Sequence, residues 1–381
     1  MTERRIRILH IIGQLHGGGC ERQLLGLCQR LDARRFDLSV CWYGPMAHEL
    51  DGEFRAAGVN TIFFNKFSMP AWRFFLTLRR KIREVSPDIV HTWLTSANFW
   101  GRWAAVSCGV PHIVASERSL VAKPGLIQRA SERALARRSH RLANSKVAAA
   151  SVERLSGLPA ERIRVIYNAV SLPTGDRETA RAEIRRELGV PGNQRLVVMV
   201  AHLRPGKNHE MFVRCGARVR RDRRDVTFAS LGSGPLEARL IEQAASLGVS
   251  RDVRFLGERG DVPRWLAAAD LFCLTTYHEA FPNSVLEAMA AGLPIVSTPF
   301  SSLDELTGGQ DLVVKVPFDD DEAMAREIAG LLEDPDRRRR LGDKGRSWVR
   351  ERYTWERLVG EMESFYEDLL RKRARPAGAR A

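Results

Sequence analysis

Short apolar runs alternate with amphipathic stretches along nearly the whole chain of 381 residues. Brief apolar runs rich in β-branched residues predict buried strands, and apolar positions spaced by three or four residues predict helices. In the first half, strands are predicted at 7–12, 37–42, 60–64, 89–92, 112–116, 141–143 and 163–167. In the second half, they are predicted at 196–200, 227–231, 253–256, 271–274, 295–297 and 312–315. Helical stretches such as 21–31, 46–57 and 130–136 lie between them, so the pattern predicts an α/β fold with parallel sheets covered on both faces.

The alternation starts afresh near residues 168–175, which indicates two domains. We predict an N-terminal Rossmann-like domain at 1–170, a second Rossmann-like domain at 171–350 and a C-terminal segment at 351–381. That segment holds an amphipathic helix at 355–370 and a basic tail. Doubly wound sheets bind ligands beyond the carboxyl ends of their strands, so we expect the two domains to face a cleft.

The net charge of +14 is unevenly distributed. Residues 1–172 hold 26 Lys and Arg against 13 Asp and Glu, and the rest of the chain is nearly balanced. Helix candidate 71–85 places Trp72, Phe75, Leu76 and Ile82 near one face beside arginines, and 129–141 is also basic. This surface suits anionic lipid headgroups, and it equally suits an ordinary solvated face. No nucleic-acid-binding signature accompanies the charge, so a nucleic acid partner is not expected.

The N-terminus lacks the pattern of a signal peptide, and no apolar run is long enough for a spanning helix. We therefore expect a cytoplasmic protein. The six cysteines are scattered without any C-x-x-C pair, which predicts reduced core residues and no zinc site.

Residues 277–299 contain the most informative pattern, two glutamates eight positions apart around a helix start, Glu279 and Glu287. Pro282 fits the first helical position, and Gly292 followed by Pro294 predicts the helix end after about three turns. First-turn N–H groups lack acceptors within a helix and lie at its positive end, so a diphosphate can dock there. The two carboxylates can then contact different hydroxyls of one ligand. An ordinary buried amphipathic helix explains the same pattern about as well.

Glycines after predicted strands are weaker candidates. Gly17, Gly18 and Gly19 follow the first strand, where a backbone without Cβ atoms can approach a phosphate or sugar at a helix that opens near Glu21. A tight turn is nearly as good an explanation. Gly232 and Gly234 repeat the arrangement in the second domain, with Pro235 at a first helical position.

Three further residues carry suitable chemistry at strand ends. Arg204 and Lys207 follow the first strand of the second domain, where two cations can neutralise a diphosphate. His91 is placed at the end of an apolar strand, where a binding role competes with the more common structural role of a single histidine.

Together these residues resemble the retaining nucleotide-sugar glycosyltransferases of family four, which have the GT-B fold. The resemblance covers essentially the whole chain, and its most specific element is Glu279-x7-Glu287. Supporting matches are Gly17–Glu21, His91, Ser116–Arg118, Asn144–Ser145, Asn168, Lys207 and Gly232–Gly234. The helix around Trp355 is similar to the one that packs back on the first domain in this fold.

The resemblance implies a role for each candidate. Lys207 and a nearby arginine neutralise the donor diphosphate, Glu287 binds the ribose, Glu279 contacts the transferred sugar, and His91 stands near it on the acceptor side. The backbone of Phe281, Pro282, Asn283 and Ser284 meets the phosphates.

Three departures from the family pattern affect these expectations. His202 stands where many members have arginine, so Arg204 becomes the second cation. Ala280 replaces a frequent glycine, and Ser301–Ser302 stands where a glycine pair is common, before Glu305. No Asp-x-Asp metal motif stands in a suitable loop, so we expect a metal-independent reaction without a cofactor.

The resemblance further implies retention by front-face attack without a covalent intermediate, from a nucleotide-diphosphate sugar that we expect to be UDP-linked. We expect a lipid-linked glycan at the inner membrane face as acceptor, in surface polysaccharide synthesis. A soluble small-molecule acceptor and a non-catalytic nucleotide-binding protein are the alternatives.

Overall fold

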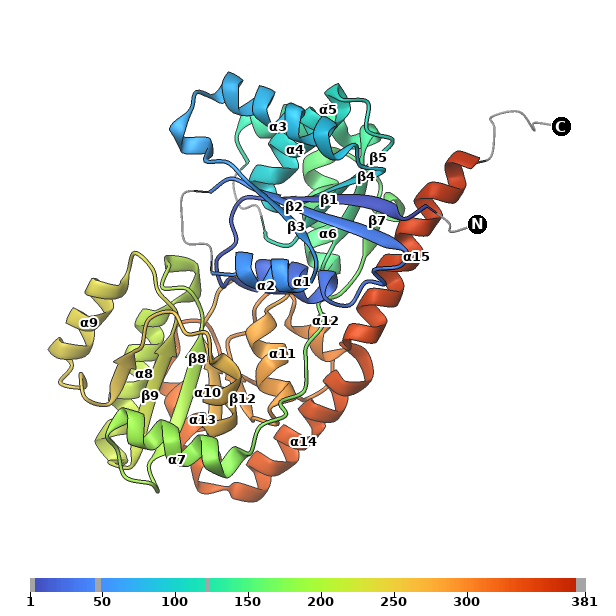
Figure 1. Ribbon diagram of the computed structural model, residues 1–381. Helices are drawn as coiled ribbons and strands as arrows, with labels where there is room; N and C mark the ends of the chain where they lie inside the picture. Colours follow the sequence, from blue (N-terminus) through green and yellow to red (C-terminus); the bar gives the residue numbers. More distant parts are fainter. Residues whose placement is uncertain (1–3, 45–48, 121–123, 375–381) are drawn as a thin grey trace. The chain divides into compact units, whose positions relative to one another are not determined.

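The computed structural model describes residues 4–44, 49–120 and 124–374. Contacts divide the chain into two compact units (Figure 1). Unit 1 comprises residues 1–168 and 355–381, and unit 2 comprises residues 169–354. The division falls two residues before the predicted first boundary and four residues after the predicted second one. The predicted helix at 46–57 begins outside the described residues, and the basic tail lies largely outside them.

Unit 1 contains a parallel sheet of order β3-β2-β1-β4-β5-β6-β7. Its strands are β1 (Ile6–Ile12), β2 (Phe36–Trp42), β3 (Asn60–Phe63), β4 (Ile89–Trp93), β5 (His112–Glu117), β6 (His140–Ala143) and β7 (Ile163–Val165). Central strand β4 is buried along its whole length, as expected for a parallel sheet with helices on both faces.

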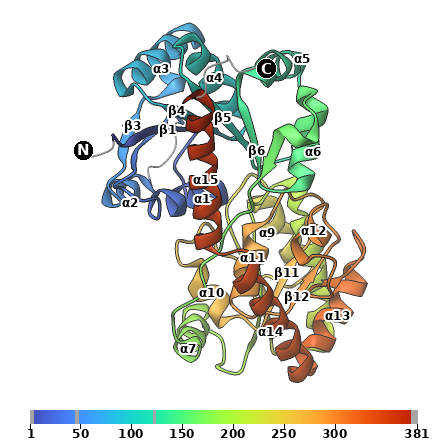
Figure 2. The ribbon, with the colours of Figure 1, turned by 90° about the vertical axis from the view of Figure 1, so that its right-hand side faces the viewer.

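The helices of unit 1 fall into two groups. They are α1 (Gly19–Cys28), α2 (Asp51–Ala56), α3 (Ala71–Val85), α4 (Leu94–Ser107), α5 (Leu126–Leu135), α6 (Lys146–Ser156) and α15 (Trp355–Ala374), with 3-10 turns at Lys66–Ser68, Ala136–Arg138 and Ala160–Arg162. Helix α4 packs against α3 and α5, and α1 packs against α2 and α15 (Figures 1 and 2). The Trp355 ring lies so close to Gly26 that a Cβ there would approach it to 2.1 Å, which fixes α15 against α1.

Unit 2 contains a second parallel sheet, of order β10-β9-β8-β11-β12-β13. Its strands are β8 (Arg195–Val200), β9 (Val226–Leu231), β10 (Val253–Phe255), β11 (Leu271–Leu274), β12 (Ile295–Ser297) and β13 (Val314–Lys315). Its helices are α7 (Arg177–Leu188), α8 (His209–Asp222), α9 (Glu237–Ser246), α10 (Val262–Ala268), α11 (Asn283–Ala290), α12 (Leu303–Thr307), α13 (Asp321–Glu333) and α14 (Pro335–Arg352), with a 3-10 turn at Pro205–Lys207. Helix α8 packs on α9 and α13, whereas α10 packs on α7 and α11, and α11 on α14.

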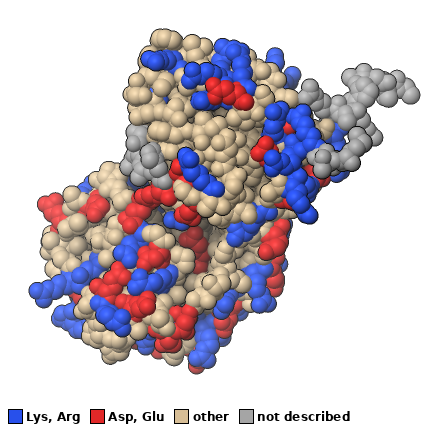
Figure 3. Space-filling view, in the orientation of Figure 1, with Lys and Arg blue, Asp and Glu red and all other residues tan. Residues whose placement is uncertain are grey.

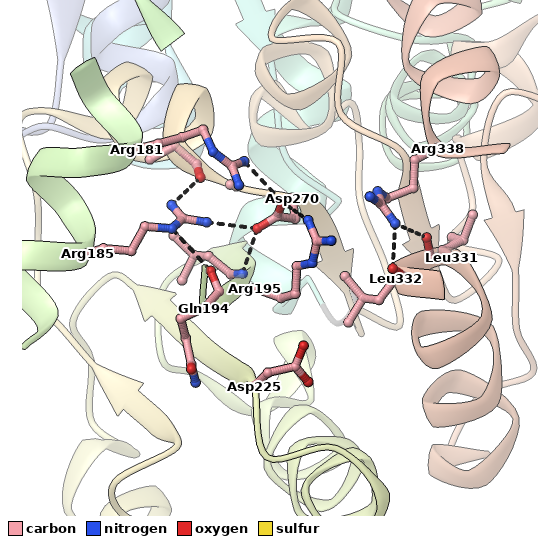
Figure 4. A network of polar contacts seen from close by, with 12 residues as sticks. Arg181, Arg185, Gln194, Arg195, Asp225, Asp270, Leu331, Leu332 and Arg338 are labelled. Atoms are coloured by element: carbon pink, nitrogen blue, oxygen red, sulfur yellow. Dashed lines mark hydrogen bonds and ion pairs between the residues drawn. The ribbon is translucent and has the colours of Figure 1, made fainter. Parts of the chain in front are cut away.

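A buried carboxylate fixes α7 to the sheet of unit 2 (Figure 4). Asp270, which directly precedes β11, accepts hydrogen bonds from Arg181 at 3.0 Å, Arg185 at 2.8 Å and Arg195 at 3.3 Å. It also accepts one from the backbone N–H of Leu196 at 2.9 Å. One carboxylate therefore compensates several guanidinium groups at the amino ends of β8 and β11, away from the strands' carboxyl ends.

Helix α3 differs from its prediction in one respect. Its buried stripe is Phe74, Leu78 and Ile82, which join the core, so Ile82 does not share a face with Trp72 and Leu76. Trp72 is 66% exposed and Leu76 is 49% exposed. The exposed face of α3 is therefore apolar and basic at the same time.

Candidate functional site

Lys207 is held by the loop between β8 and α8. It is buried, and Thr275, which directly follows β11, donates a hydrogen bond to its carbonyl at 2.9 Å. The Thr276 hydroxyl and the Tyr277 N–H both donate to the carbonyl of Gly206, at 3.0 and 3.1 Å. The carboxyl end of β11 thus fixes the backbone that carries Lys207.

Glu279 lies in the loop from β11 to α11, and its backbone is also fixed. The hydroxyls of Ser301 and Ser302 donate to its carbonyl oxygen at 3.2 and 3.1 Å. The two serines that replace a glycine pair therefore contact the candidate residue through its backbone.

The two loops meet in an ion pair between the Nζ of Lys207 and the Oε1 of Glu279. The side chains are only 11% and 13% exposed, so the pair is largely withdrawn from water. Arg204, the other predicted cation, is exposed at the start of the same 3-10 turn. The structure thus brings Lys207 and Glu279 into contact and places Arg204 nearer to solvent.

Helix α11 is shorter and begins later than predicted. Pro282 is its N-cap, with φ −76° and ψ 117°, and the helix has eight residues, about two turns. Pro282 therefore precedes the first turn instead of belonging to it, and the turn begins at Asn283 and Ser284. The proline at the N-cap forms no side-chain capping hydrogen bond. The first-turn N–H groups have no acceptor within the helix, as at any helix start.

The other residues of this motif have different surroundings. Phe281 is buried and packs edge-on against Tyr353 at 5.4 Å between ring centroids, so its side chain belongs to the core. Glu287 lies on the second turn of α11 and is half-buried.

The two candidate glycines of unit 2, Gly232 and Gly234, are required by close backbone packing. Gly232 has φ +135°, and a Cβ there would lie 2.2 Å from the carbonyl oxygen of Ala201. A Cβ on Gly234 would lie 2.5 Å from the carbonyl oxygen of Leu203. These glycines let the β9–α9 loop lie directly against the loop that carries Arg204 and Lys207. Pro235 precedes α9 by two residues, so it is not at the predicted first helical position.

Two residues that the sequence did not single out stabilise the same loop. Asn208 adopts a left-handed conformation with φ +49°, and its amide donates to Asp319 at 2.9 Å. Asp319 also accepts a hydrogen bond from the hydroxyl of Tyr277 at 2.6 Å, which raises the pKa of Tyr277 to about 12. An asparagine before a predicted helix is a signal for such a conformation, but its partner is 111 residues away.

In unit 1, His91 lies inside β4 and not at its end, because the strand continues to Trp93. It is fully buried, and its two ring nitrogens form hydrogen bonds of 2.7 Å with Tyr366 of α15 and Ser116 of β5. Burial, with smaller effects from His10 and Arg118, holds its pKa well below the usual value. Burial thus favours the neutral form of His91, and its contact with a sugar stays a prediction.

The glycine loop of unit 1 also differs from its prediction in position. Helix α1 begins at Gly19, two residues before Glu21, with Gly18 as N-cap. The N–H of Gly17 donates to Glu49 at 3.2 Å. A Cβ on Gly18 would lie 2.5 Å from the carboxylate of Glu21, so the acidic side chain folds back over the helix start.

Other matched residues of unit 1 have structural partners. The Ser145 hydroxyl caps α6 by accepting from the N–H of Ala148 at 3.0 Å. Arg118 lies over the Trp93 ring, 4.4 Å from its centroid, and donates to Asn168 at 2.6 Å. Among the described residues, no three His, Cys, Asp or Glu side chains are grouped so that they could hold a metal ion. No helix within the described ranges is both long and apolar enough to span a membrane.

Family models match both halves of the chain. Residues 17–173 match Glycosyltransferase Family 4, and residues 180–348 match Glycosyl transferases group 1. The D-inositol 3-phosphate glycosyltransferase of Salinispora arenicola is 30% identical over 313 residues, 74% of this chain and 69% of that protein. The chain belongs to the group 1 glycosyltransferases. Another relative is the UDP-Gal:α-D-GlcNAc-diphosphoundecaprenol α-1,3-galactosyltransferase of Escherichia coli, 26% identical over 84% of each chain.

Solved structures confirm the predicted GT-B fold of this glycosyltransferase. Anabaena HepE in complex with UDP-glucose superposes with a TM-score of 0.83 at 20% identity, covering 96% of this chain and all of that one. WaaG, a glycosyltransferase involved in lipopolysaccharide biosynthesis, superposes with a TM-score of 0.73 at 18% identity, covering 94% and 99%. At such identities the superpositions establish the fold alone.

Proposed function

We propose that this glycosyltransferase moves a sugar from a UDP-linked donor to a hydroxyl of a lipid-linked glycan, with retention at the anomeric carbon. The buried pair of Lys207 and Glu279 carries the proposal. It joins a cation suited to a diphosphate and a carboxylate suited to sugar hydroxyls at the start of α11. The HepE complex with UDP-glucose supports the choice of donor, because it is a protein of the same fold with such a donor bound.

In the proposed reaction, Lys207, Arg204 and the first-turn N–H groups of α11 stabilise the charge of the departing diphosphate. These groups supply the positive charge from the protein itself, so the proposed reaction needs no metal ion or cofactor. The half-buried Glu287 binds the ribose hydroxyls, one to two turns from the phosphate-binding end of the helix.

Glu279 positions the sugar and does not attack it. As the diphosphate takes over Lys207, the carboxylate accepts hydrogen bonds from sugar hydroxyls, which lowers its nucleophilicity, and the two serine hydroxyls on its backbone carbonyl restrict its movement. The acceptor hydroxyl therefore attacks on the face from which the phosphate departs, and the phosphate takes its proton. A trapped covalent adduct on Glu279 would contradict this step.

A lipid-linked acceptor is favoured by the exposed face of α3 and by the diphosphoundecaprenol in the name of the Escherichia coli relative. In this proposal, the enzyme works as a peripheral protein at the cytoplasmic face of the membrane, in polysaccharide synthesis. A soluble acceptor is the second candidate. It is favoured by the similarity to the D-inositol 3-phosphate glycosyltransferase and to an N-acetyl-α-D-glucosaminyl L-malate synthase of Bacillus anthracis, 25% identical.

A donor screen followed by a transfer assay tests the proposal. A donor that binds the native state raises its melting temperature by mass action, so UDP sugars are expected to stabilise the protein more than GDP or ADP sugars do. The donor that stabilises most is then incubated with a GlcNAc-diphospholipid, inositol 3-phosphate or malate, and the anomeric configuration of the product is read by NMR. An inverted product excludes the proposed mechanism, and donor binding without transfer to any acceptor favours the non-catalytic alternative.

A further inference from the structure

Lys66 lies at the carboxyl edge of the sheet of unit 1, just after β3. Its N–H donates to the carbonyl of Tyr43 at 3.0 Å, and the N–H of Tyr43 donates to the carbonyl of Gly13 at 3.3 Å. The residues that follow β1, β2 and β3 are therefore joined in one row. Open α/β sheets bind ligands at this edge.

The ammonium group of Lys66 is surrounded by aromatic rings. Its Nζ lies 5.2 Å from the ring centroid of Trp100, 5.4 Å from Phe74, 5.8 Å from Tyr43 and 5.9 Å from Phe67. Rings at this distance attract a cation and restrict the side chain. The hydroxyl of Tyr43 is held by Ser96 of α4, at 3.0 Å.

No carboxylate pairs with Lys66 among the residues that the structure describes. Its side chain is half-buried, and burial lowers the pKa of the ammonium group. By contrast, Lys207 and Lys315 each form an ion pair, with Glu279 and Asp304. Lys66 thus holds a partly dehydrated positive charge in a fixed position, without a counter-charge in the described part of the chain.

We propose that Lys66 binds an anionic group of the acceptor, a phosphate or a carboxylate, and so selects acidic acceptors over neutral ones. The inference rests on the proposed transfer function and defines its acceptor class. The geometry carries it, because the aromatic rings hold the charge at the ligand-binding edge and leave the N–H donors of the ammonium for an oxyanion. Lys66 touches the acceptor away from the reacting hydroxyl, so it acts on acceptor binding and not on the chemical step.

A direct binding test does not depend on catalysis. The chain has eight lysines, so after reductive ¹³C-methylation, which keeps their charge, each signal can be assigned by substitution. The full-length protein is saturated with UDP to fill the donor site and then titrated with inorganic phosphate, pyrophosphate or malonate. We expect the Lys66 signal to shift on titration while that of the exposed Lys344 does not. A Lys66 signal that does not move at millimolar concentrations of all three anions overturns the proposal.

A kinetic test uses Lys66→Met, which keeps the aliphatic stem between the rings, and Lys66→Arg, which keeps the charge. Acceptors are compared in pairs that differ only in the anionic group, such as inositol 3-phosphate and inositol. Losing a hydrogen bond to a charged group is expected to raise the KM of the Met variant for the phosphorylated acceptor about 10- to 100-fold, with kcat changed less than about 3-fold.

Two control variants and the wild-type enzyme distinguish a failure of the role of Lys66 from a failure of the proposed transfer function. For the phosphorylated acceptor, the KM of Lys66→Arg should stay within about 5-fold of the wild-type value. The control Lys344→Met should have the wild-type KM. An unchanged preference for the phosphorylated acceptor in Lys66→Met overturns the role of Lys66 while the transfer function stands. A wild-type enzyme that transfers no sugar contradicts the proposed function, whereas the anion titration still decides whether Lys66 is an anion site.

Discussion

The ammonium of Lys207 and the carboxylate of Glu279 form a largely buried ion pair between two loops that are 72 residues apart in sequence. Each group compensates the charge of the other. A diphosphate that approaches Lys207 must therefore compete with Glu279, whose carboxylate becomes free for sugar hydroxyls as the pair loosens.

Replacing one partner should separate donor binding from transfer. We expect Glu279→Gln to bind UDP as tightly as the wild type or up to about 10-fold more tightly, because a competing charge is removed, while kcat falls at least about 100-fold. Lys207→Met should weaken UDP binding about 10- to 100-fold. Isothermal titration with UDP and a transfer assay measure both effects. Weaker UDP binding by Glu279→Gln would show that the carboxylate does not compete with the diphosphate.

Gly232 is a glycine of unit 2 that cannot carry a side chain without strain. An alanine there would place its Cβ 2.2 Å from the carbonyl oxygen of Ala201 at a φ of +135°, so we expect Gly232→Ala to destabilise the protein by about 3 kcal/mol or more. Gly260→Ala is the matched control, because nothing lies within 4 Å of its Cβ position. Urea unfolding measures both variants. A Gly232→Ala variant as stable as Gly260→Ala would mean that the two loops can separate at little cost.

The sequence predicts the strands well because the central strands of both sheets are buried and mostly apolar, as in β1, β8 and β11. It predicts helix starts less well. Pro282 and Pro235 each suit a first helical position locally, but in the structure α11 begins one residue after Pro282 and α9 begins two residues after Pro235. Sequence spacing cannot predict that Lys207 pairs with Glu279, because the pairing depends on two loops that hydrogen bonds from Thr275 and Thr276 hold together.

Partners distant in sequence explain the other differences. The sequence shows His91 near a strand end, and nothing local indicates that Tyr366, 275 residues later, occupies one of its nitrogens. Lys66 is likewise an ordinary loop lysine in the sequence. Phe67 follows it directly, but its other three aromatic neighbours, Tyr43, Phe74 and Trp100, come from separate segments that only the fold brings together.

Substitution of Asp270 should lower the stability of the protein more than substitution of most other polar residues of unit 2. Asp270→Asn leaves Arg185, whose side chain is 2% exposed, without its compensating charge, and removing one partner of a buried pair costs about 3–5 kcal/mol. The control Asp304→Asn breaks an ion pair with Lys315 in which the aspartate is 78% exposed, and it should cost less than about 1 kcal/mol. Urea unfolding gives the free energy of unfolding of both variants for comparison. Equal losses of stability would show that the Asp270 cluster is no more stabilising than a surface pair.

Buried histidines should make the protein less stable in weak acid. Burial, aided by the charge of Lys207, lowers the pKa of His209 to about 4 from its usual 6.5. Between these values the unfolded chain binds more protons than the native one, so the free energy of unfolding falls as the pH drops from 6.5 toward 4. Each such histidine contributes at most about 1.4 kcal/mol per pH unit.

The variant His209→Gln isolates this contribution. Burial lowers the pKa of His10 to about 3 and also lowers that of His91, so both histidines add to the same trend and stay in the variant. We expect the slope of unfolding free energy against pH to decrease by up to about 1.4 kcal/mol per pH unit in the window from 4 to 6.5. Urea unfolding at several pH values gives the slope, and an unchanged slope would mean that His209 is protonated in the native state.

The exposed face of α3 provides the test of membrane docking. On the face shown in Figure 3, acidic and basic side chains are intermixed over unit 2, so a purely electrostatic attraction to lipid is not expected there. In unit 1, Trp72 and Leu76 lie on a helix with Arg79 and Arg80, and apolar and basic groups together favour an anionic bilayer surface. We expect the double variant Trp72→Ala, Leu76→Ala to bind anionic vesicles about 10- to 100-fold more weakly than the wild type.

A matched double variant in unit 2 controls for the loss of exposed apolar area. Ile241 and Leu247 are 49% and 43% exposed, comparable to Leu76, and their replacement by alanine should leave vesicle binding unchanged. Sedimentation with phosphatidylglycerol vesicles at about 50 and 500 mM salt measures both, and binding of the wild type should weaken at the higher salt because screening reduces the attraction of the arginines. Absence of wild-type binding at low salt would exclude electrostatic docking and favour the soluble acceptor. Equal losses of vesicle binding in the two double variants would instead mean that the lipid contact is not specific to α3.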